Sequence, residues 1–405
     1  MYRTDSTERT SDTVFILGAG FSFDAGIPLM AGFVDTMWDL AYRRTNRGSP
    51  LSNDDAQIFS NAMKVRHELN EYHGRAAFDD RNIEDLLSIL SFNSYLPQPG
   101  RVNRLATMTK AIARTIELRC EVKHPGVEKP GHGRIVKEGS ELYRRFWRAL
   151  LGLPNVSSQM PALITFNYDL VLERAFFQTT IGTHFSRYDK QPPFSRARLL
   201  HHYAPIPTLT YEIGYATYGD FDSRKDGTVL NVVNQAEGDH ALEIDILKLH
   251  GSLNFPSPRS NFDPKTFRVT ESLDEPFILP PIFNKQSSGK QQEIWRRALI
   301  HLRNAKNVVI VGYSLPKTDI YMQYFLKAAL GPNVNLNRIF VFDPALHCQG
   351  KGADEMEARY ADCFSPQLRN RITFRPPKAE KKHFVAGTTE HFVDTLATQP
   401  EYLVF

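Results

Sequence analysis

Short apolar runs recur along the chain, and each is followed by small or polar residues. Runs of four to eight apolar residues bounded by turn-forming residues are typical of buried strands. Between several of these runs, leucine, isoleucine and phenylalanine occur at helical spacing, as in residues 82–90 and 320–330. Strands that alternate with helices predict an α/β fold, in which a parallel sheet is covered by helices on both faces. The predicted strands are 13–17, 162–166, 244–249, 307–311 and 338–342.

Two long segments interrupt this alternation. Residues 43–158 are mostly helical in pattern, whereas residues 183–240 are rich in Tyr, His and Pro and show no clean periodicity. We predict that both are insertions into one domain spanning 13–405. The first is expected to form a helical cap, in which Asp80 or Asn82 begins a helix, and the second a lid or partner surface. Residues 1–12 are predicted to form a polar N-terminal arm.

The composition is that of an ordinary globular protein, with 41% hydrophobic and 23% charged residues in a chain of 405. The net charge of +4 is too small to imply nucleic-acid binding. Residues 101–148 carry twelve Lys and Arg against five Glu. A solvated surface is the favoured interpretation of this segment, and a docking face for an acidic partner or nucleic acid is the alternative.

The location of the protein is predicted from its apolar runs and its cysteines. No apolar run reaches the length that spans a membrane, and the first residues lack the apolar core of a signal peptide. The three cysteines are dispersed and form neither a metal-binding pair nor a disulfide framework. These features predict a cytoplasmic protein.

The first predicted strand leads into GAGFSFDAGIP, residues 18–28. Gly18 and Gly20 allow a sharp turn and let a phosphate approach the backbone, while Ser22 adds a hydroxyl donor. The helix expected to follow supplies free N–H groups and the positive end of its dipole. Tight packing of a helix against the strand is the alternative interpretation. The nearest carboxylates, Asp35 and Asp39, fall inside the first predicted helix, which counts against a dehydrogenase.

Two further strand ends carry side chains that suit catalysis. In TFNYD, Asn167 offers an amide donor and a carbonyl acceptor that could orient a sugar hydroxyl or a water, although a helix cap is the favoured interpretation of this motif taken alone. In KLHGS, His250 stands between a strand and Gly251, where it could act as a base near neutral pH. A structural histidine is the alternative.

The last two strand ends offer contacts for a phosphate or a ribose. VGYSLPKTD places Gly312, Tyr313 and Ser314 after a strand, and FVFDPA places Asp343 after the next. A simple turn and a helix cap are the alternatives for these two loops. Because ligands of parallel α/β sheets bind beyond the carboxyl ends of the strands, we expect all of these loops to converge on one site.

In this order, the five motifs resemble the sirtuin fold, a Rossmann-type parallel sheet, and more narrowly the sirtuin-like NAD-cleaving enzymes of bacterial anti-phage systems. The resemblance implies that NAD is the substrate, that Asn167 orients the ribose and the water, and that His250 is the base. It implies NAD contacts at Gly18, Ala19, Gly20, Ser22, Asp169, Gly312, Tyr313, Ser314 and Asp343.

The chain also departs from the deacylating sirtuins. They carry a four-cysteine zinc module that three dispersed cysteines cannot build, so no metal is expected. They continue AGIP with Asp-Phe-Arg, whereas this chain reads AGIPLMAGF. These departures favour hydrolysis of NAD to ADP-ribose and nicotinamide over removal of acyl groups from lysine.

The resemblance implies a gated effector that depletes NAD during infection, because uncontrolled loss of NAD would kill the host. Gating is expected to come from homo-oligomerisation or from a separate ATPase of the HerA translocase type, since no GxxxxGK[ST] stretch is present. A sensor or scaffold that binds NAD or ADP-ribose without turnover is the first alternative. A zinc-independent deacylase is less favoured, and a dehydrogenase ranks last.

Overall fold

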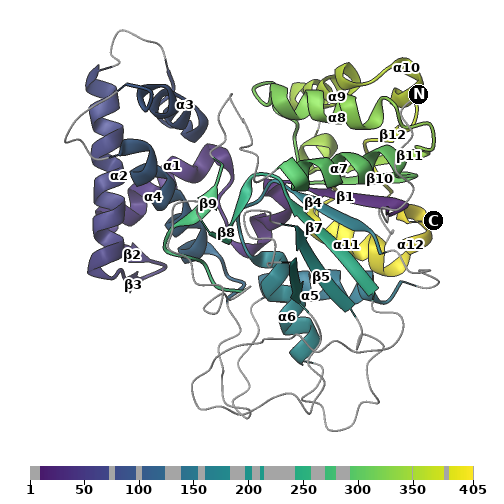
Figure 1. Cartoon of the computed structure of the whole chain (residues 1–405), viewed down its shortest axis with the longest axis horizontal. Coiled ribbons are helices and arrows are strands. Elements are labelled where there is room, and N and C mark those ends of the chain that lie inside the picture. Colours follow the sequence, from purple (N-terminus) through teal and green to yellow (C-terminus); the bar gives the residue numbers. More distant parts are fainter. Residues whose placement is uncertain are drawn as a thin grey trace.

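The protein was examined as a computed structural model of the chain (Figure 1). The structure describes residues 10–72, 78–96, 103–123, 138–153, 160–182, 197–202, 210–213, 242–256, 270–279, 292–348, 350–377 and 383–404.

The centre of the molecule is an eight-stranded sheet in the order β12-β11-β10-β1-β4-β7-β5-β6. All neighbouring strands pair in parallel except β5 and β6, which pair antiparallel at one edge. The five strands predicted from apolar runs are confirmed as β1, β4, β7, β10 and β11. The strands of the sheet are β1 Thr13–Leu17, β4 Ala162–Thr165, β5 Ala197–His202, β6 Thr210–Ile213, β7 Leu242–Lys248, β10 Asn307–Val311, β11 Arg338–Phe342 and β12 Ile372–Thr373.

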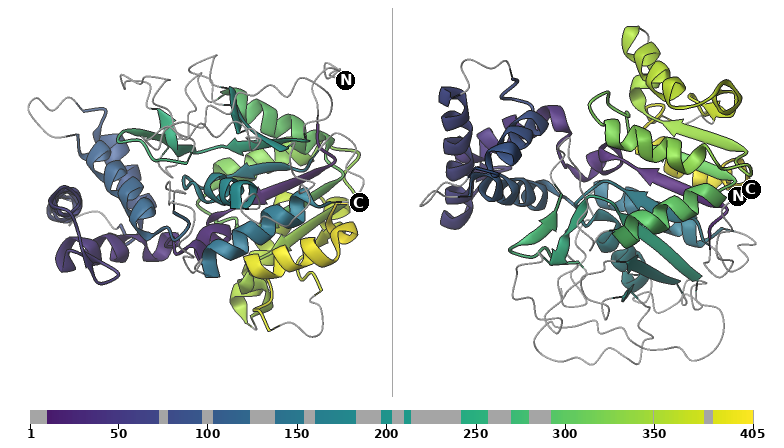
Figure 2. Two further views of the ribbon diagram at one scale, coloured as in Figure 1. Left: turned by 90° about the horizontal axis from the view of Figure 1, so that it is seen from below. Right: turned by 45° about the horizontal axis from the view of Figure 1, so that its top comes forward.

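Helices cover both faces of the sheet, as the strand–helix alternation predicts (Figure 2). Phe15 and Leu17 of β1 pack on one side with α5, α6 and α11, whereas Val14 and Ile16 pack on the other side with α7, α8 and α9. All five residues of β1 are buried, because this strand lies in the middle of the sheet. These helices are α5 Glu138–Leu151, α6 Val171–Gly182, α7 Gln292–Asn304, α8 Ile320–Leu330, α9 Lys351–Cys363 and α11 Thr389–Thr398.

Four further helices form a separate helical region at one end of the sheet, drawn in purple and blue in Figure 1. Asn82 begins α3 and accepts a hydrogen bond from the Glu84 amide at 2.9 Å. Asp80, the other residue considered for this cap, instead accepts hydrogen bonds from Arg66 and Asn70. The helices are α1 Met30–Arg43, α2 Asn53–Tyr72, α3 Ile83–Asn93 and α4 Arg104–Arg119.

Short elements complete the described part of the chain. They are two small antiparallel pairs, two 3₁₀ helices and two short helices near the C-terminus. Their bounds are β2 Thr45–Asn46, β3 Ser49–Pro50, β8 Gly251–Pro256, β9 Pro276–Ile278, η1 Ala19–Ala25, η4 Pro344–His347, α10 Pro366–Arg369 and α12 Pro400–Leu403.

The segment after the glycine turn differs from the expected α-helix. It forms the seven-residue 3₁₀ helix η1, which Gly26 ends in the left-handed conformation with φ of 83°. The next α-helix begins only at Met30 and belongs to the helical region. The glycine turn is therefore followed by a short 3₁₀ helix, and the left-handed Gly26 redirects the chain before the next α-helix begins.

The loops after β1 and β10 interlock through their glycines. The Gly18 amide donates to the carbonyl of Val311 at 2.9 Å, and the Gly20 amide donates to the carbonyl of Gly312 at 2.8 Å. Gly312 has a φ of 62°, and a Cβ built on it would lie 2.3 Å from the Phe21 nitrogen. The chain leaves β1 toward β4 on one side and returns to β10 on the other, so this contact marks the topological switch point.

We predict that Gly312→Ala lowers the free energy of unfolding by about 2 kcal/mol or more. The added methyl would collide with backbone atoms, and alanine would be held in a left-handed conformation. Gly32→Ala in α1 is the matched control, since a Cβ there meets nothing within 4 Å. It should raise stability by about 0.5 kcal/mol, because alanine favours the helix. Urea unfolding measures the free energy of unfolding of both variants. Equal changes in the two variants would contradict the close contact between the β1 and β10 loops.

Candidate functional site

All five loops predicted to converge leave neighbouring strands at the same level; the Asp343 loop follows Phe342, which pairs with Val311. Leu17 pairs with Thr165 on one side and with Val311 on the other, and Thr165 pairs with Lys248. The loops that follow begin at Gly18, Phe166, Leu249, Gly312 and Asp343. The structure therefore brings the glycine loop, the Asn167 loop, the His250 loop, the Gly312 loop and the Asp343 loop together at the carboxyl edge of the sheet.

The Asn167 side chain holds the glycine loop in place. Its Nδ2 donates to the Gly18 carbonyl at 2.8 Å and to the Ser22 hydroxyl oxygen at 2.9 Å. Both amide hydrogens are thus used, and no described residue donates to the Asn167 carboxamide oxygen. An oxygen with free lone pairs can accept a hydrogen bond from a ribose hydroxyl or a water.

Asp169, rather than Asn167, caps the helix that follows. Its Oδ1 accepts a hydrogen bond from the Val171 amide at 3.0 Å, at the start of α6. Ser22, which is buried, also donates its hydroxyl hydrogen to the Asp169 carboxylate. Burial raises the pKa of Asp169, while the nearby Lys248 charge and these two hydrogen bonds oppose that rise. Ser22 therefore links Asn167 to a buried carboxyl group.

His250 is buried among aromatic rings at the end of β7. Its ring centroid lies 5.4 Å from that of Phe166, 6.3 Å from that of Tyr168 and 6.4 Å from that of Trp295. Gly251 has a φ of 89°, and a Cβ built there would lie 2.2 Å from the Phe277 carbonyl oxygen. The β8–β9 pair therefore requires glycine after the histidine, and this turn sets the position of the imidazole.

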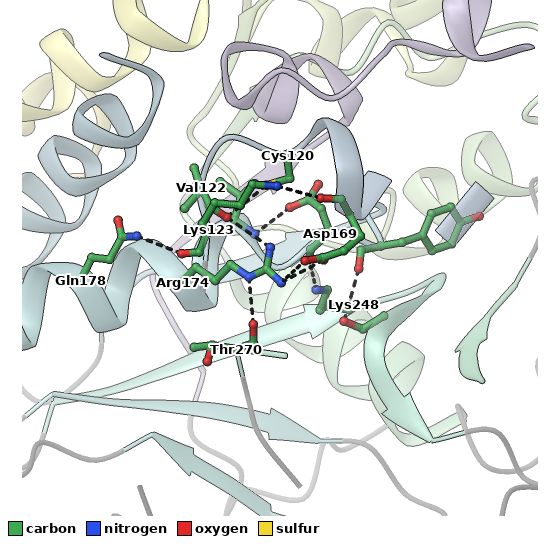
Figure 3. Close-up of polar contacts among 12 residues, drawn as sticks. Cys120, Val122, Lys123, Asp169, Arg174, Gln178, Lys248 and Thr270 are labelled. Atoms are coloured by element: carbon green, nitrogen blue, oxygen red, sulfur yellow. Dashed lines mark hydrogen bonds and ion pairs between the residues drawn. The ribbon is translucent and has the colours of Figure 1, made fainter. Parts of the chain in front are cut away.

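A buried ion pair links Lys248, labelled in Figure 3, to Glu173 of α6. Lys248 Nζ lies 2.9 Å from Glu173 Oε1, and the two side chains are 1% and 0% exposed. Lys248 also donates to the backbone carbonyl of Asp169. The pair joins the end of β7, two residues before His250, to the first turn of α6. Lys248 lies within an apolar run, so its pattern predicts a strand and not an ion pair.

Arg174 connects the same part of α6 to the helical region (Figure 3). Its guanidinium donates to both carboxylate oxygens of Glu117 at 3.0 and 2.9 Å, to the Thr270 carbonyl at 2.9 Å and to the Val122 carbonyl at 3.2 Å. Beside this cluster, burial raises the pKa of the Cys120 thiol to about 12. Arg174 therefore fastens the end of α4 and the chain that leaves it to α6.

The later loops place their polar side chains in structural contacts. Tyr313 packs against the Phe166 ring, with centroids 4.7 Å apart, and donates to Asp319 at 2.9 Å. Asp343 caps η4 by accepting from the Ala345 amide at 2.9 Å, and burial raises its pKa. Ser314 is exposed, and its carbonyl accepts from Arg359. The cap interpretation thus accounts for Asp343, while ligand contacts by these three residues stay predictions.

Within the described ranges, no group of three or more His, Cys, Asp or Glu side chains is arranged to hold a metal ion. The three cysteines are free; Cys120 and Cys363 are buried and Cys348 is exposed. No helix in the described part of the chain is both long and apolar enough to cross a membrane.

Comparison with known proteins supports a sirtuin-like fold. A family model for a SIR2-like domain matches residues 161–361, which include β4, β7, β10 and β11 but not the glycine loop. No curated protein matches the chain.

Solved structures of Sir2 proteins are also similar over most of their length. One is a mutant Sir2 homologue in complex with ADP-ribose, with 13% identity over 87% of this chain and 91% of that chain and a TM-score of 0.31. Another is described as a structural basis for the mechanism and regulation of Sir2 enzymes. It has 12% identity over 89% of this chain and 94% of that chain and a TM-score of 0.29.

We predict that Lys248→Met lowers the free energy of unfolding by about 3–5 kcal/mol, because it leaves the Glu173 carboxylate buried without its cation. The double variant Lys248→Met/Glu173→Leu should recover most of this loss, since both charges of the pair are then removed. Denaturant unfolding of the three proteins measures the difference. A double variant no more stable than the single one would contradict the role of the pair.

Proposed function

We propose that this protein hydrolyses NAD to ADP-ribose and nicotinamide. The observation that carries the proposal is the arrangement of Asn167, whose amide hydrogens are committed to Gly18 and Ser22 and whose oxygen points to no described partner. A buried histidine, His250, follows the neighbouring strand. The sirtuin-like fold supports NAD as the substrate. The glycine loop that leads into the 3₁₀ turn, where Gly18 and Gly20 carry no side chain, suits its diphosphate.

In the proposed reaction, the bond between the nicotinamide nitrogen and the ribose carbon breaks, and its electron pair neutralises the leaving nicotinamide. The ribose then carries oxocarbenium character, which needs positioned polar groups more than a strong nucleophile. The Asn167 oxygen orients a ribose hydroxyl or the water. The water adds to the ribose carbon, and His250 takes the proton that is released.

The biological part of the proposal rests on the resemblance stated from the sequence motifs. We propose a cytoplasmic effector of bacterial anti-phage defence that depletes NAD once activated. Homo-oligomerisation or a partner ATPase of the HerA translocase type would supply the gate. The alternatives are a sensor that binds NAD or ADP-ribose without turnover and a deacylase that acts without zinc.

We expect Asn167→Ala and His250→Ala each to lower the rate of NAD turnover by at least about 100-fold, since each removes a group that positions or deprotonates the attacking water. Purified protein is incubated with NAD, alone and with candidate partners, and nicotinamide and ADP-ribose are quantified. The same assay with an acylated peptide tests the deacylase alternative.

Asn333→Ala is the matched control for Asn167→Ala. The Asn333 amide likewise donates to two acceptors, the carbonyls of Leu302 and Ala305, but it lies away from the strand-end loops. It should lower stability and leave turnover per folded molecule unchanged. Turnover that persists in both site variants would overturn the site, and tight NAD binding without product would favour the sensor.

A further inference from the structure

Trp295 lies in the first turn of α7, beside the candidate base. Helix α7 spans Gln292–Asn304 and leads directly into β10, so its first turn lies at the edge where the parallel strands end. The Trp295 ring is 6.4 Å from the His250 ring and 5.2 Å from that of Tyr321, which opens α8 after the Gly312 loop. Trp295 is thus held between two of the loops that form the candidate site.

The indole N–H of Trp295 has no hydrogen-bond partner in the described part of the chain, although the side chain is only 6% exposed. A buried donor without an acceptor is costly, so native proteins rarely leave one. The other buried tryptophan follows that rule, because Trp147 Nε1 donates to the Leu172 carbonyl at 2.9 Å. The contrast indicates that Trp295 is arranged for an acceptor that the described residues do not supply.

Aromatic side chains extend from the candidate base, His250, toward the surface of the protein. The rings of Phe166 and Trp295 both lie near the His250 ring, and Tyr321, whose ring contacts that of Trp295, is 40% exposed. Aromatic walls with few polar groups are typical of small-molecule sites, where each polar group fixes the orientation of the ligand. In this wall, the Trp295 N–H is such a group.

We propose that the Trp295 indole N–H is a positioning donor for the nicotinamide ribose of NAD and donates to one of its oxygens beside His250. The inference rests on the proposed function and adds a residue that neither the motifs nor the family match assigns. Asn167 would then contact the ribose with an acceptor and Trp295 with a donor. Trp295 takes no part in proton transfer.

The test compares two tryptophan variants by calorimetric titration. Trp295→Phe keeps an aromatic ring and removes the N–H, so we expect ADP-ribose to bind about tenfold more weakly, as the loss of one hydrogen bond implies. ADP lacks the distal ribose and should bind the wild type and the variant equally. Trp147→Phe, the matched control, should lower the unfolding temperature and leave the affinity for ADP-ribose unchanged.

Indole N–H resonances supply a second readout. The chain has three tryptophans, so ¹⁵N-labelled protein gives three indole signals, and the one lost in Trp295→Phe is assigned to Trp295. That signal should move when ADP-ribose is added, and the Trp147 signal should not.

The outcomes separate this inference from the proposed function. ADP-ribose binding with a stationary Trp295 signal and equal affinity for Trp295→Phe would overturn the inference and leave NAD cleavage standing. Wild-type protein that binds neither NAD nor ADP-ribose would overturn the proposed function and this inference with it.

Discussion

The backbone contact between the β1 loop and the β10 loop sets the geometry on which the site depends. Gly18, Gly20 and Gly312 approach so closely that none has room for a side chain. At this switch point the two halves of the sheet diverge, and polar groups of adjacent strands meet. Asn167 extends the contact to a third strand by binding the Gly18 carbonyl and Ser22. A ligand bound here would contact loops that are already joined to one another by hydrogen bonds.

Buried ion pairs join the strands and helices that carry these loops. The Lys248–Glu173 pair ties β7 to α6, and the Lys248 ammonium opposes the rise that burial causes in the Asp169 pKa. Arg174 then ties α6 to the end of the helical region through Glu117. A displacement of the helical region would therefore act first on the helix that Asp169 caps. That route connects the predicted cap to the predicted catalytic residues.

The sequence predicts the parts of the fold that depend on local pattern. Buried parallel strands appear as uninterrupted apolar runs, so five strands and their polar ends could be located, with the convergence of their loops. Strand β5 and the edge strand β6 were missed because residues 183–240 show no clean period. The 3₁₀ helix was missed because the close packing at Gly26 involves residues far along the chain: a Cβ built there would lie 2.4 Å from an Arg47 guanidinium nitrogen and 2.9 Å from the Arg119 carbonyl oxygen. The structural roles of Lys248 and Trp295 could not be predicted from local pattern, because the residues that they contact lie far along the chain.

The central claim is that the interlocked loops and Asn167 bind the ADP-ribose part of NAD at the carboxyl edge of the sheet. A crystal structure of the full chain with ADP-ribose measures this most directly. The account predicts the diphosphate against the glycine loop of residues 18–22 and the distal ribose within hydrogen-bond distance of the Asn167 carboxamide oxygen. ADP-ribose bound elsewhere, with Asn167 out of reach, would contradict it.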